Sequence, residues 1–334
     1  MDFKKLHVLV VEDLQPMREL LVDILDTLGV GTITTTDNGE EAFRIYCRKT
    51  PDLVITDWHM SPMDGIALTK KIRTDPSVAD PTKPIIMMTG YGSPERISEA
   101  RDHGVTEFLV KPFSVKDLSR RLTHIIKSPR DFIVTETFAG PDRRRKVKDG
   151  FEETSKREGS EKIIRRIKAS YELLTKVGGE EIDPEVIVRC QKILDNNKVN
   201  FAPLAQKYID EIDSEIQVIK SLDEVPLHHL QNISSPVMQI KANARIFKYD
   251  RLGDLAAVML NFLEHLNEVD DDVIKIIEAH DKSLRLIVEK EISGDGGDVG
   301  KHFQKELEDV CNRYARARSE KQKRQLEKTM REKD

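Results

Sequence analysis

The sequence has few of the residues that build disulfide frameworks, zinc sites or membrane spans. It holds three cysteines in 334 residues, Cys47, Cys190 and Cys311, and these lie far apart without any paired spacing. Such usage argues against a disulfide scaffold or a zinc site and favours reduced thiols. No apolar run approaches the length of a membrane span, and the first residues lack a signal-peptide core. We therefore expect a cytoplasmic protein with no membrane segment.

Aromatic residues are also scarce, at 5%, whereas 34% of the residues are charged. The length suffices for two or three domains with cores of their own. Residues 169–300 carry 14 Lys and Arg against 25 Asp and Glu, and basic segments flank them. An acidic middle segment, without a helix-turn-helix pattern or an aromatic platform, does not favour nucleic acid as a partner.

Residues 1–127 alternate between strand-like and helix-like stretches. Strands are predicted at 6–11, 31–36, 53–57, 84–89 and 106–110, with helices at about 15–28, 38–48, 64–74, 94–103 and 115–127. Five such units, with strands that are almost continuously apolar, predict an α/β domain with a parallel sheet covered on both faces. Sites of open parallel sheets lie outside the carboxyl ends of the strands.

Polar residues mark the carboxyl ends of four predicted strands: Glu12, Asp13, Asp57, Thr89 and Lys111. A carboxylate attacks phosphorus only when its charge and that of the phosphoryl group are offset, and Mg²⁺ with carboxylate ligands does this. We predict Asp57 as a phosphoacceptor, with Mg²⁺ on Asp13 and Asp57 and with Glu12 acting through water.

Two further groups complete the predicted site. Lys111 offers a positive charge to a phosphoryl oxygen, and Thr89 offers a hydroxyl donor. The Lys111-Pro112 bond is a candidate for the cis form. Any one of these residues could instead be a helix cap or a strand terminus. Their occurrence at the ends of the correct strands, in order, favours a site.

These residues resemble the receiver domain of bacterial two-component response regulators. The resemblance rests on Glu12-Asp13, Asp57-Trp58, Met63-Asp64-Gly65, Thr89-Gly90 and Lys111-Pro112-Phe113, and it covers residues 1–127. It implies a flavodoxin-like fold with five strands. It also implies that Asp57 is phosphorylated by the phosphohistidine of a sensor histidine kinase or a phosphotransfer protein.

The resemblance further implies that Mg²⁺ is bound by Asp13, Asp57 and the backbone carbonyl of His59. Family members carry an aromatic switch at the position of Phe108, which here lacks a hydroxyl group. On this hypothesis, phosphorylation pulls Thr89 toward the new oxygens and lets Phe108 turn inward. His59 and Tyr91 are expected to flank the site.

Beyond residue 127 the sequence predicts three further segments. Proline, glycine and clustered charges predict a charged linker over 128–160. Apolar residues at helical spacing then predict an all-α region, an antiparallel helix bundle over 161–292. A Gly-rich hinge and a charged helix are expected over 293–334.

The segment 238–247 resembles the central helix of a histidine phosphotransfer domain, whose motif is His-x-x-Lys-Gly with an exposed histidine. Alignment on Lys241 places Met238 at the histidine and Ala242 at the glycine. Because methionine has no nitrogen to phosphorylate, the resemblance implies a degenerate phosphotransfer bundle. The alternative is an ordinary bundle in which Lys241 lies on a solvated face.

The leading hypothesis is a response regulator of a two-component phosphorelay. In it, Mg²⁺-dependent phosphorylation of Asp57 switches protein–protein interactions, and no enzymatic output is expected. One alternative is a phosphorelay intermediate that uses a histidine of the bundle, and a weaker one is a DNA-binding regulator. The downstream protein partner stays open, as does homodimer formation through the charged C-terminal helix.

Overall fold

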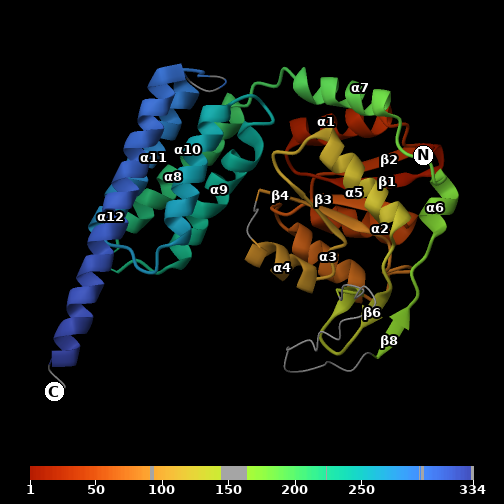
Figure 1. Ribbon diagram of the computed structural model, residues 1–334, viewed down its shortest axis with the longest axis horizontal. Coiled ribbons are helices and arrows are strands. Elements are labelled where there is room, and N and C mark those ends of the chain that lie inside the picture. Colours follow the sequence, from red (N-terminus) through yellow and green to blue (C-terminus); the bar gives the residue numbers. More distant parts are fainter. Residues whose placement is uncertain (91–93, 144–163, 223, 293, 295–296, 332–334) are drawn as a thin grey trace, which may run out of the picture. The chain divides into compact units, whose positions relative to one another are not determined.

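The computed structural model describes residues 1–90, 94–143, 164–222, 224–292, 294 and 297–331. It divides into two compact units, Met1–Asn197 and Lys198–Asp334 (Figure 1). Within the described residues, no helix has both the length and the apolar character needed to cross a membrane.

A parallel sheet of five strands forms the centre of the first unit. Its order is β2-β1-β3-β4-β5, and all four pairings are parallel. The strands are β1 (His7–Val11), β2 (Thr32–Thr36), β3 (Leu53–Asp57), β4 (Ile85–Thr89) and β5 (Glu107–Val110). The predicted α/β class and its five-stranded parallel sheet are therefore confirmed, with each strand within a residue of its expected bounds.

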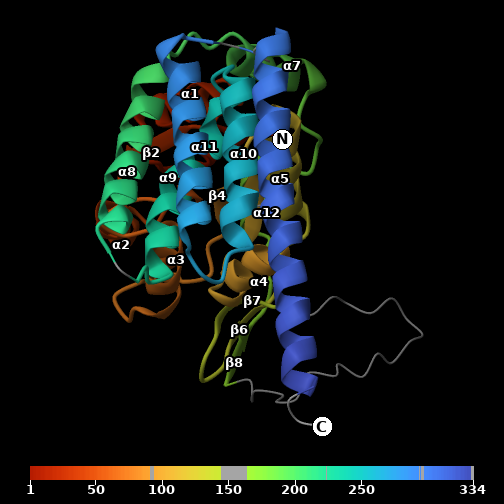
Figure 2. The same cartoon turned by 90° about the vertical axis from the view of Figure 1, so that its left-hand side faces the viewer.

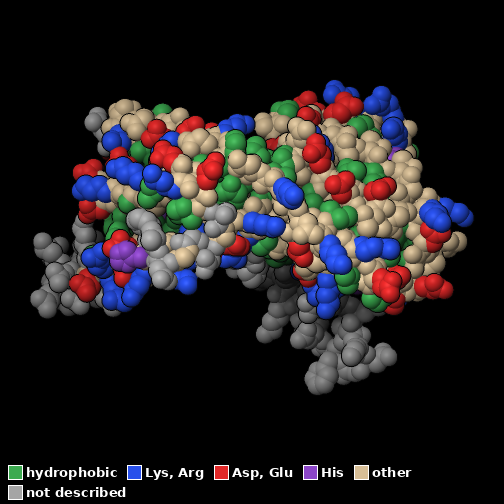
Figure 3. Space-filling model, turned by 90° about the horizontal axis from the view of Figure 1, so that it is seen from above, with side chains coloured by type: hydrophobic (Ala, Val, Ile, Leu, Met, Phe, Trp, Pro, Cys, Tyr) green, Lys and Arg blue, Asp and Glu red, His purple; other side chains and the backbone are tan. Residues whose placement is uncertain are grey.

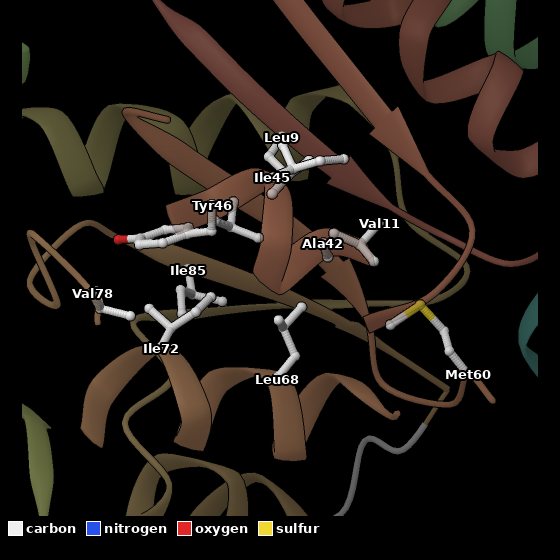
Figure 4. Packing of buried hydrophobic residues seen from close by; sticks show 11 residues of the cluster. Leu9, Val11, Ala42, Ile45, Tyr46, Met60, Leu68, Ile72, Val78 and Ile85 are labelled. Atoms are coloured by element: carbon white, nitrogen blue, oxygen red, sulfur yellow. The ribbon is translucent and has the colours of Figure 1, made fainter. Parts of the chain in front are cut away.

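Helices cover both faces of this sheet. They are α1 (Gln15–Thr27), α2 (Gly39–Lys49), α3 (Gly65–Thr74), α4 (Pro94–Asp102) and α5 (Val115–Lys127), preceded by a short 3₁₀ turn η1 (Phe3–Lys5). Because strand side chains alternate between faces, Leu9 and Val11 point toward α2 and α3. There they pack with Ile45 and Tyr46 of α2 and Leu68 of α3 (Figure 4). This core fixes the sheet edge at which the polar residues lie.

Three short strands follow the receiver-like part, where we expected first a linker and then helices only. They are β6 (Phe132–Val134), β7 (Ala139–Pro141) and β8 (Arg165–Ile167), which form an antiparallel sheet in the order β7-β6-β8. Strands β6 and β7 therefore lie in the expected linker over 128–160, and β8 lies in the region that was expected to hold helices only. Three residues are too few to show a hydrophobic period, so the pattern could not reveal them. Residues 144–163 of the expected linker lie outside the described residues.

Two helices extend the first unit to Asn197, beyond the boundaries expected at 127 and 160. They are α6 (Glu172–Val177) and α7 (Pro184–Asp195). Helix α6 packs near η1 and α5, and α7 packs on α1 and α5. Residues expected in the bundle thus belong to the sheet-containing unit.

The second unit is all-α, as expected. Its helices are α8 (Ala202–Lys220), α9 (His228–Ala244), α10 (Asp250–Glu264), α11 (Asp271–Glu289) and α12 (Gly297–Arg331). Helices α8 to α11 contact one another in a closed ring, and α12 packs on α10 and α11 (Figure 2). In the expected Gly-rich hinge, Gly294 and Gly297 have φ of 64° and 59°, values that glycine adopts readily.

Candidate functional site

Three carboxylates meet at the carboxyl edge of the large sheet. Strands β1 and β3 are neighbours, and their ends bring Glu12, Asp13 and Asp57 together. One ligand oxygen from each lies within 4.8 Å of the other two. Among the described residues, no other group of three or more such side chains lies close enough together to hold a metal ion. Glu12 is 1% exposed and Asp57 is 3% exposed, whereas Asp13 faces solvent. The sheet topology therefore assembles the acidic residues that the sequence predicts as cation ligands.

Lys111 supplies the positive charge of this cluster. It follows β5, and its Nζ donates to Asp57 Oδ1 at 2.7 Å and to Glu12 Oε2 at 2.9 Å. The Lys111 side chain is buried, and its bond to Pro112 is cis, as suggested by the sequence. Two carboxylates and one ammonium group thus form a buried ionic triangle.

The electrostatics of the cluster reflect crowding of negative charge. Burial, and then the charge of Asp57, raise the pKa of Glu12 to about 8 although Lys111 opposes the shift. Loss of water around the Asp13 carboxyl, and then the charge of Asp57, raise the pKa of Asp13 to about 6 although the residue as a whole is exposed. Burial alone would lower the pKa of Lys111, but the charges of Asp57 and Glu12 outweigh it and raise this pKa. A site with surplus negative charge is suited to a cation.

A glycine after β3 fixes the position of Asp57. The Gly65 N–H donates to the carbonyl of Trp58 at 2.9 Å, and Asp64 caps α3 through its bond from Ala67 N. A Cβ on Gly65 would lie 2.1 Å from the Asp57 carbonyl oxygen, closer than any side chain allows. The Met63-Asp64-Gly65 turn therefore needs glycine because two backbone segments approach one another closely.

Four other residues are predicted at this site: His59, Thr89, Tyr91 and Phe108. Thr89 ends β4, next to β3, and is 1% exposed. His59 is half-buried two residues after Asp57, and cation binding by its carbonyl stays a prediction. Phe108 is 6% exposed and packs with Trp58, Met87 and Val105. The Phe108 ring is already buried, so the expected inward turn on phosphorylation does not start from an exposed ring. Tyr91 lies outside the described residues.

The three residues predicted in the helical unit lie on α9, but they form no exposed docking position. Met238 is 1% exposed and Ala242 is 3% exposed. Lys241 is half-buried, and burial lowers its pKa. The phosphotransfer motif calls for an exposed residue at the histidine position, so burial of Met238 does not support that resemblance. The helical pattern predicted the helix, but it could not assign this face to the core.

Sequence reasoning missed one contact at the edge of the site. Arg18, the fourth residue of α1, donates from Nη1 to the Glu12 carbonyl at 2.5 Å. It also approaches the Asp13 carbonyl at 3.4 Å. These bonds hold the backbone that carries both acids. A single arginine in an amphipathic helix gives no sequence signal of such a role.

Comparison with known proteins agrees with this geometry. The family model of the response regulator receiver domain matches residues 8–123. Chemotaxis protein CheY-3 of Vibrio cholerae is 34% identical over 124 residues, which cover 37% of this chain and 94% of the relative. A probable transcriptional regulator, ycf27 of Guillardia theta, is 34% identical over 123 residues, 46% of its length.

Among solved structures, the receiver domain of sensor histidine kinase PA1611 from Pseudomonas aeruginosa is 27% identical with a TM-score of 0.34. The match covers 37% of this chain and 98% of that domain, which was crystallised with magnesium in its active-site cleft.

The fold and the acidic edge define a parallel α/β protein with a cluster of carboxylates and one buried lysine. The chain belongs to the response regulator receiver family through its N-terminal part.

Proposed function

We propose that this protein is a response regulator whose Asp57 accepts a phosphoryl group from a histidine kinase or a phosphotransfer protein. The observation that carries the proposal is the contact of 2.7 Å between Lys111 Nζ and Asp57 Oδ1 inside the carboxylate cluster. A lysine that neutralises the acceptor also lies where it can bind a transferred phosphoryl oxygen. In the transfer, an Asp57 carboxylate oxygen bonds to phosphorus while the bond from phosphorus to the donor histidine nitrogen breaks.

The donor set fits Mg²⁺, which prefers oxygen ligands and commonly takes one or two carboxylates. Asp13, Asp57 and the His59 carbonyl would hold the ion, with Glu12 reached through water. Bound there, the ion would neutralise charge on the phosphoryl oxygens. Lys111 would follow the new oxygens away from its present partners, and the buried hydroxyl of Thr89 would donate to one of them.

The proposed output is a protein contact that depends on phosphorylation, in a protein without catalytic output. Nucleic acid is not favoured: on the face seen in Figure 3, Lys and Arg side chains are mixed with Asp and Glu. A basic field, which drives binding to phosphate backbones, does not form on this face. Burial of Met238 and Ala242 assigns them to packing, so we do not place the output contact on them.

Asp57→Asn tests the proposal. With a small phosphodonor and Mg²⁺, the natural chain should gain one acid-labile phosphoryl group by intact-mass measurement, and Asp57→Asn should gain none. Asp37→Asn is the matched control, because Asp37 is an exposed aspartate just after β2 at the same sheet edge. Labelling of Asp57→Asn to the level of the natural chain would refute the assignment.

A further inference from the structure

Helix α7 lies on the sheet-containing unit as an added, amphipathic element. It contacts α1 and α5, with α7 drawn against these two helices in Figure 1. Cys190 and Leu194 are buried, one helical turn apart, whereas Val188 on the other side of α7 is 54% exposed. One stripe of α7 therefore covers the surface made by α1 and α5.

Cys190 lies in the middle of this contact. Its side chain is 0% exposed, and the thiol donates to the carbonyl of Ile24 on α1 at 3.6 Å. Burial raises the pKa of this thiol. A buried thiol with a raised pKa reacts slowly, because the thiolate is the nucleophile. Reactivity of Cys190 therefore measures how often α7 leaves α1.

Gln191, the next residue, joins α7 to the start of α5. Its Oε1 accepts the backbone N–H of Val115 at 2.9 Å. Val115 is the first residue of α5, and the first N–H groups of a helix have no partner within the helix. Ser114 caps the Asp117 N–H instead. The Gln191 amide is held in place by Asp195, which accepts from Nε2 at 2.8 Å.

Val115 is only four residues from Lys111, the residue that contacts the phosphoacceptor. In this state Lys111 is held by Asp57 and Glu12 at 2.7 and 2.9 Å. A phosphoryl group on Asp57 adds oxygens and negative charge beyond the present carboxylate. Lys111 must then find new partners, and the segment 112–114 links that movement to the Val115 N–H.

We propose that α7 is a docked helix whose hold on α1 and α5 is set by the phosphorylation state of Asp57, through the contact between Gln191 and Val115. The inference rests on the proposed function. The hydrogen bond from Val115 N–H to Gln191 Oε1 forms with the segment after Lys111 in its present position. When phosphorylation moves that segment, this hydrogen bond weakens and α7 loosens.

Thiol labelling of the full chain tests this directly. The natural protein is exposed to a thiol reagent with and without a small phosphodonor and Mg²⁺, and labelled peptides are quantified by mass spectrometry. Cys47, a half-buried residue of α2 whose Sγ lies 3.8 Å from Ser77 Oγ, is the internal reference. We expect phosphorylation to speed labelling of Cys190 relative to Cys47 about fivefold or more, the lower end of typical coupling between sites.

Two variants locate the coupling. Gln191→Ala should speed labelling of Cys190 without phosphodonor and abolish most of the further effect of phosphorylation. Gln206→Ala on α8 is the matched control, since Gln206 makes the same bond to a residue four positions on, Asp210, and belongs to the second compact unit. It should behave like the natural chain. Hydrogen exchange of the α7 amides provides a second measurement on each protein.

Intact mass separates the two hypotheses. A chain that gains a phosphoryl group on Asp57, yet shows unchanged Cys190 labelling and unchanged α7 exchange, overturns this inference and leaves the proposed function standing. A chain that gains no phosphoryl group overturns both. Equal effects of phosphorylation in the natural chain and Gln191→Ala would overturn the role of Gln191.

Discussion

At the scale of single residues, Lys111 supplies the positive charge that neutralises the buried carboxylates of the site. It is buried together with Asp57 and Glu12, and both carboxylates share its one positive charge. Loss of one partner from a buried ionic group is costly, because the partner left behind has neither water nor a counter-charge. The lysine is thus needed for the stability of the edge as well as for binding a phosphoryl group.

Lys111→Ala should lower the free energy of unfolding by about 3–5 kcal/mol in the absence of divalent cations. Urea unfolding with a chelator present measures it. Millimolar Mg²⁺ should restore part of the loss, because the ion replaces the missing charge. Lys116→Ala, at an exposed position on the first turn of α5, should change stability little. Equal losses in the two variants would contradict the role given to Lys111.

At the scale of elements, α11 holds two adjacent titratable residues whose pKa values are shifted in opposite directions by burial. Burial lowers the pKa of His280 to about 4 and raises the pKa of Asp281 to about 6. His280 Nε2 lies 3.4 Å from Cys311 Sγ, while His280 Nδ1 and Asp281 Oδ1 have no hydrogen-bond partner in the described part of the chain. Both groups therefore favour the neutral form in the folded bundle.

The two groups give pH dependences of opposite sign. The folded state resists protonation of His280, so its contribution to stability falls as pH drops from 6.5 toward 4. Folding favours protonated Asp281, so its contribution is present below pH 3.8 and is lost as pH rises through 6. Between pH 4 and 6 the two contributions partly cancel.

Asp281→Asn should remove the contribution of Asp281 to the pH dependence of stability and leave that of His280. Relative to the natural chain, the variant should gain about 1–2 kcal/mol of stability on going from pH 4 to pH 7, after allowance for solvent screening. Urea unfolding at several pH values gives this difference. Glu289→Gln, exposed near the end of the same helix, should show no comparable gain. A difference between Asp281→Asn and the natural chain that does not change with pH would rule out the explanation.

The hydrophobic pattern of the sequence predicted the strands of the large sheet but not those of the small one. Strands β1, β3 and β4 are nearly continuous apolar runs that are almost wholly buried, so hydrophobicity located them, whereas β2 is rich in threonine and mostly exposed or half-buried. Strands β6 to β8 have three residues each, and β7 contains Gly140-Pro141, which is typical of a turn. Their pairing depends on residues distant in the chain, which a local pattern does not record.

At the scale of the whole molecule, the carboxyl edge was predictable and the covering segments were not. Residues 12, 57 and 111 were expected at one edge of the sheet once the strands were parallel, because carboxyl ends share one edge. Docking of α7 on α1 and α5 depends on which stripe of a short helix faces which surface. The sequence of α7 shows an amphipathic helix, but it does not name the surface that the helix covers.

The first compact unit ends at Asn197, and this boundary makes a prediction about fragments. A fragment of residues 1–197 should be more stable than residues 1–127 by about 2–5 kcal/mol, because the shorter piece loses the burial of Phe132, Val177, Cys190 and Leu194. Their urea unfolding curves give the comparison. Equal stability would place the boundary at residue 127 and would mean that residues 128–197 add no stability.

The ionic triangle also has a consequence for the order of synthesis. Glu12 and Lys111 are 99 residues apart in the chain, and the ribosome makes the amino-terminal part first. All three carboxylates thus emerge before the lysine that neutralises two of them. A growing chain carries an acidic edge without its counter-charge until the fifth strand has been made and has docked, so a phosphoacceptor paired with its lysine exists only in a completed sheet.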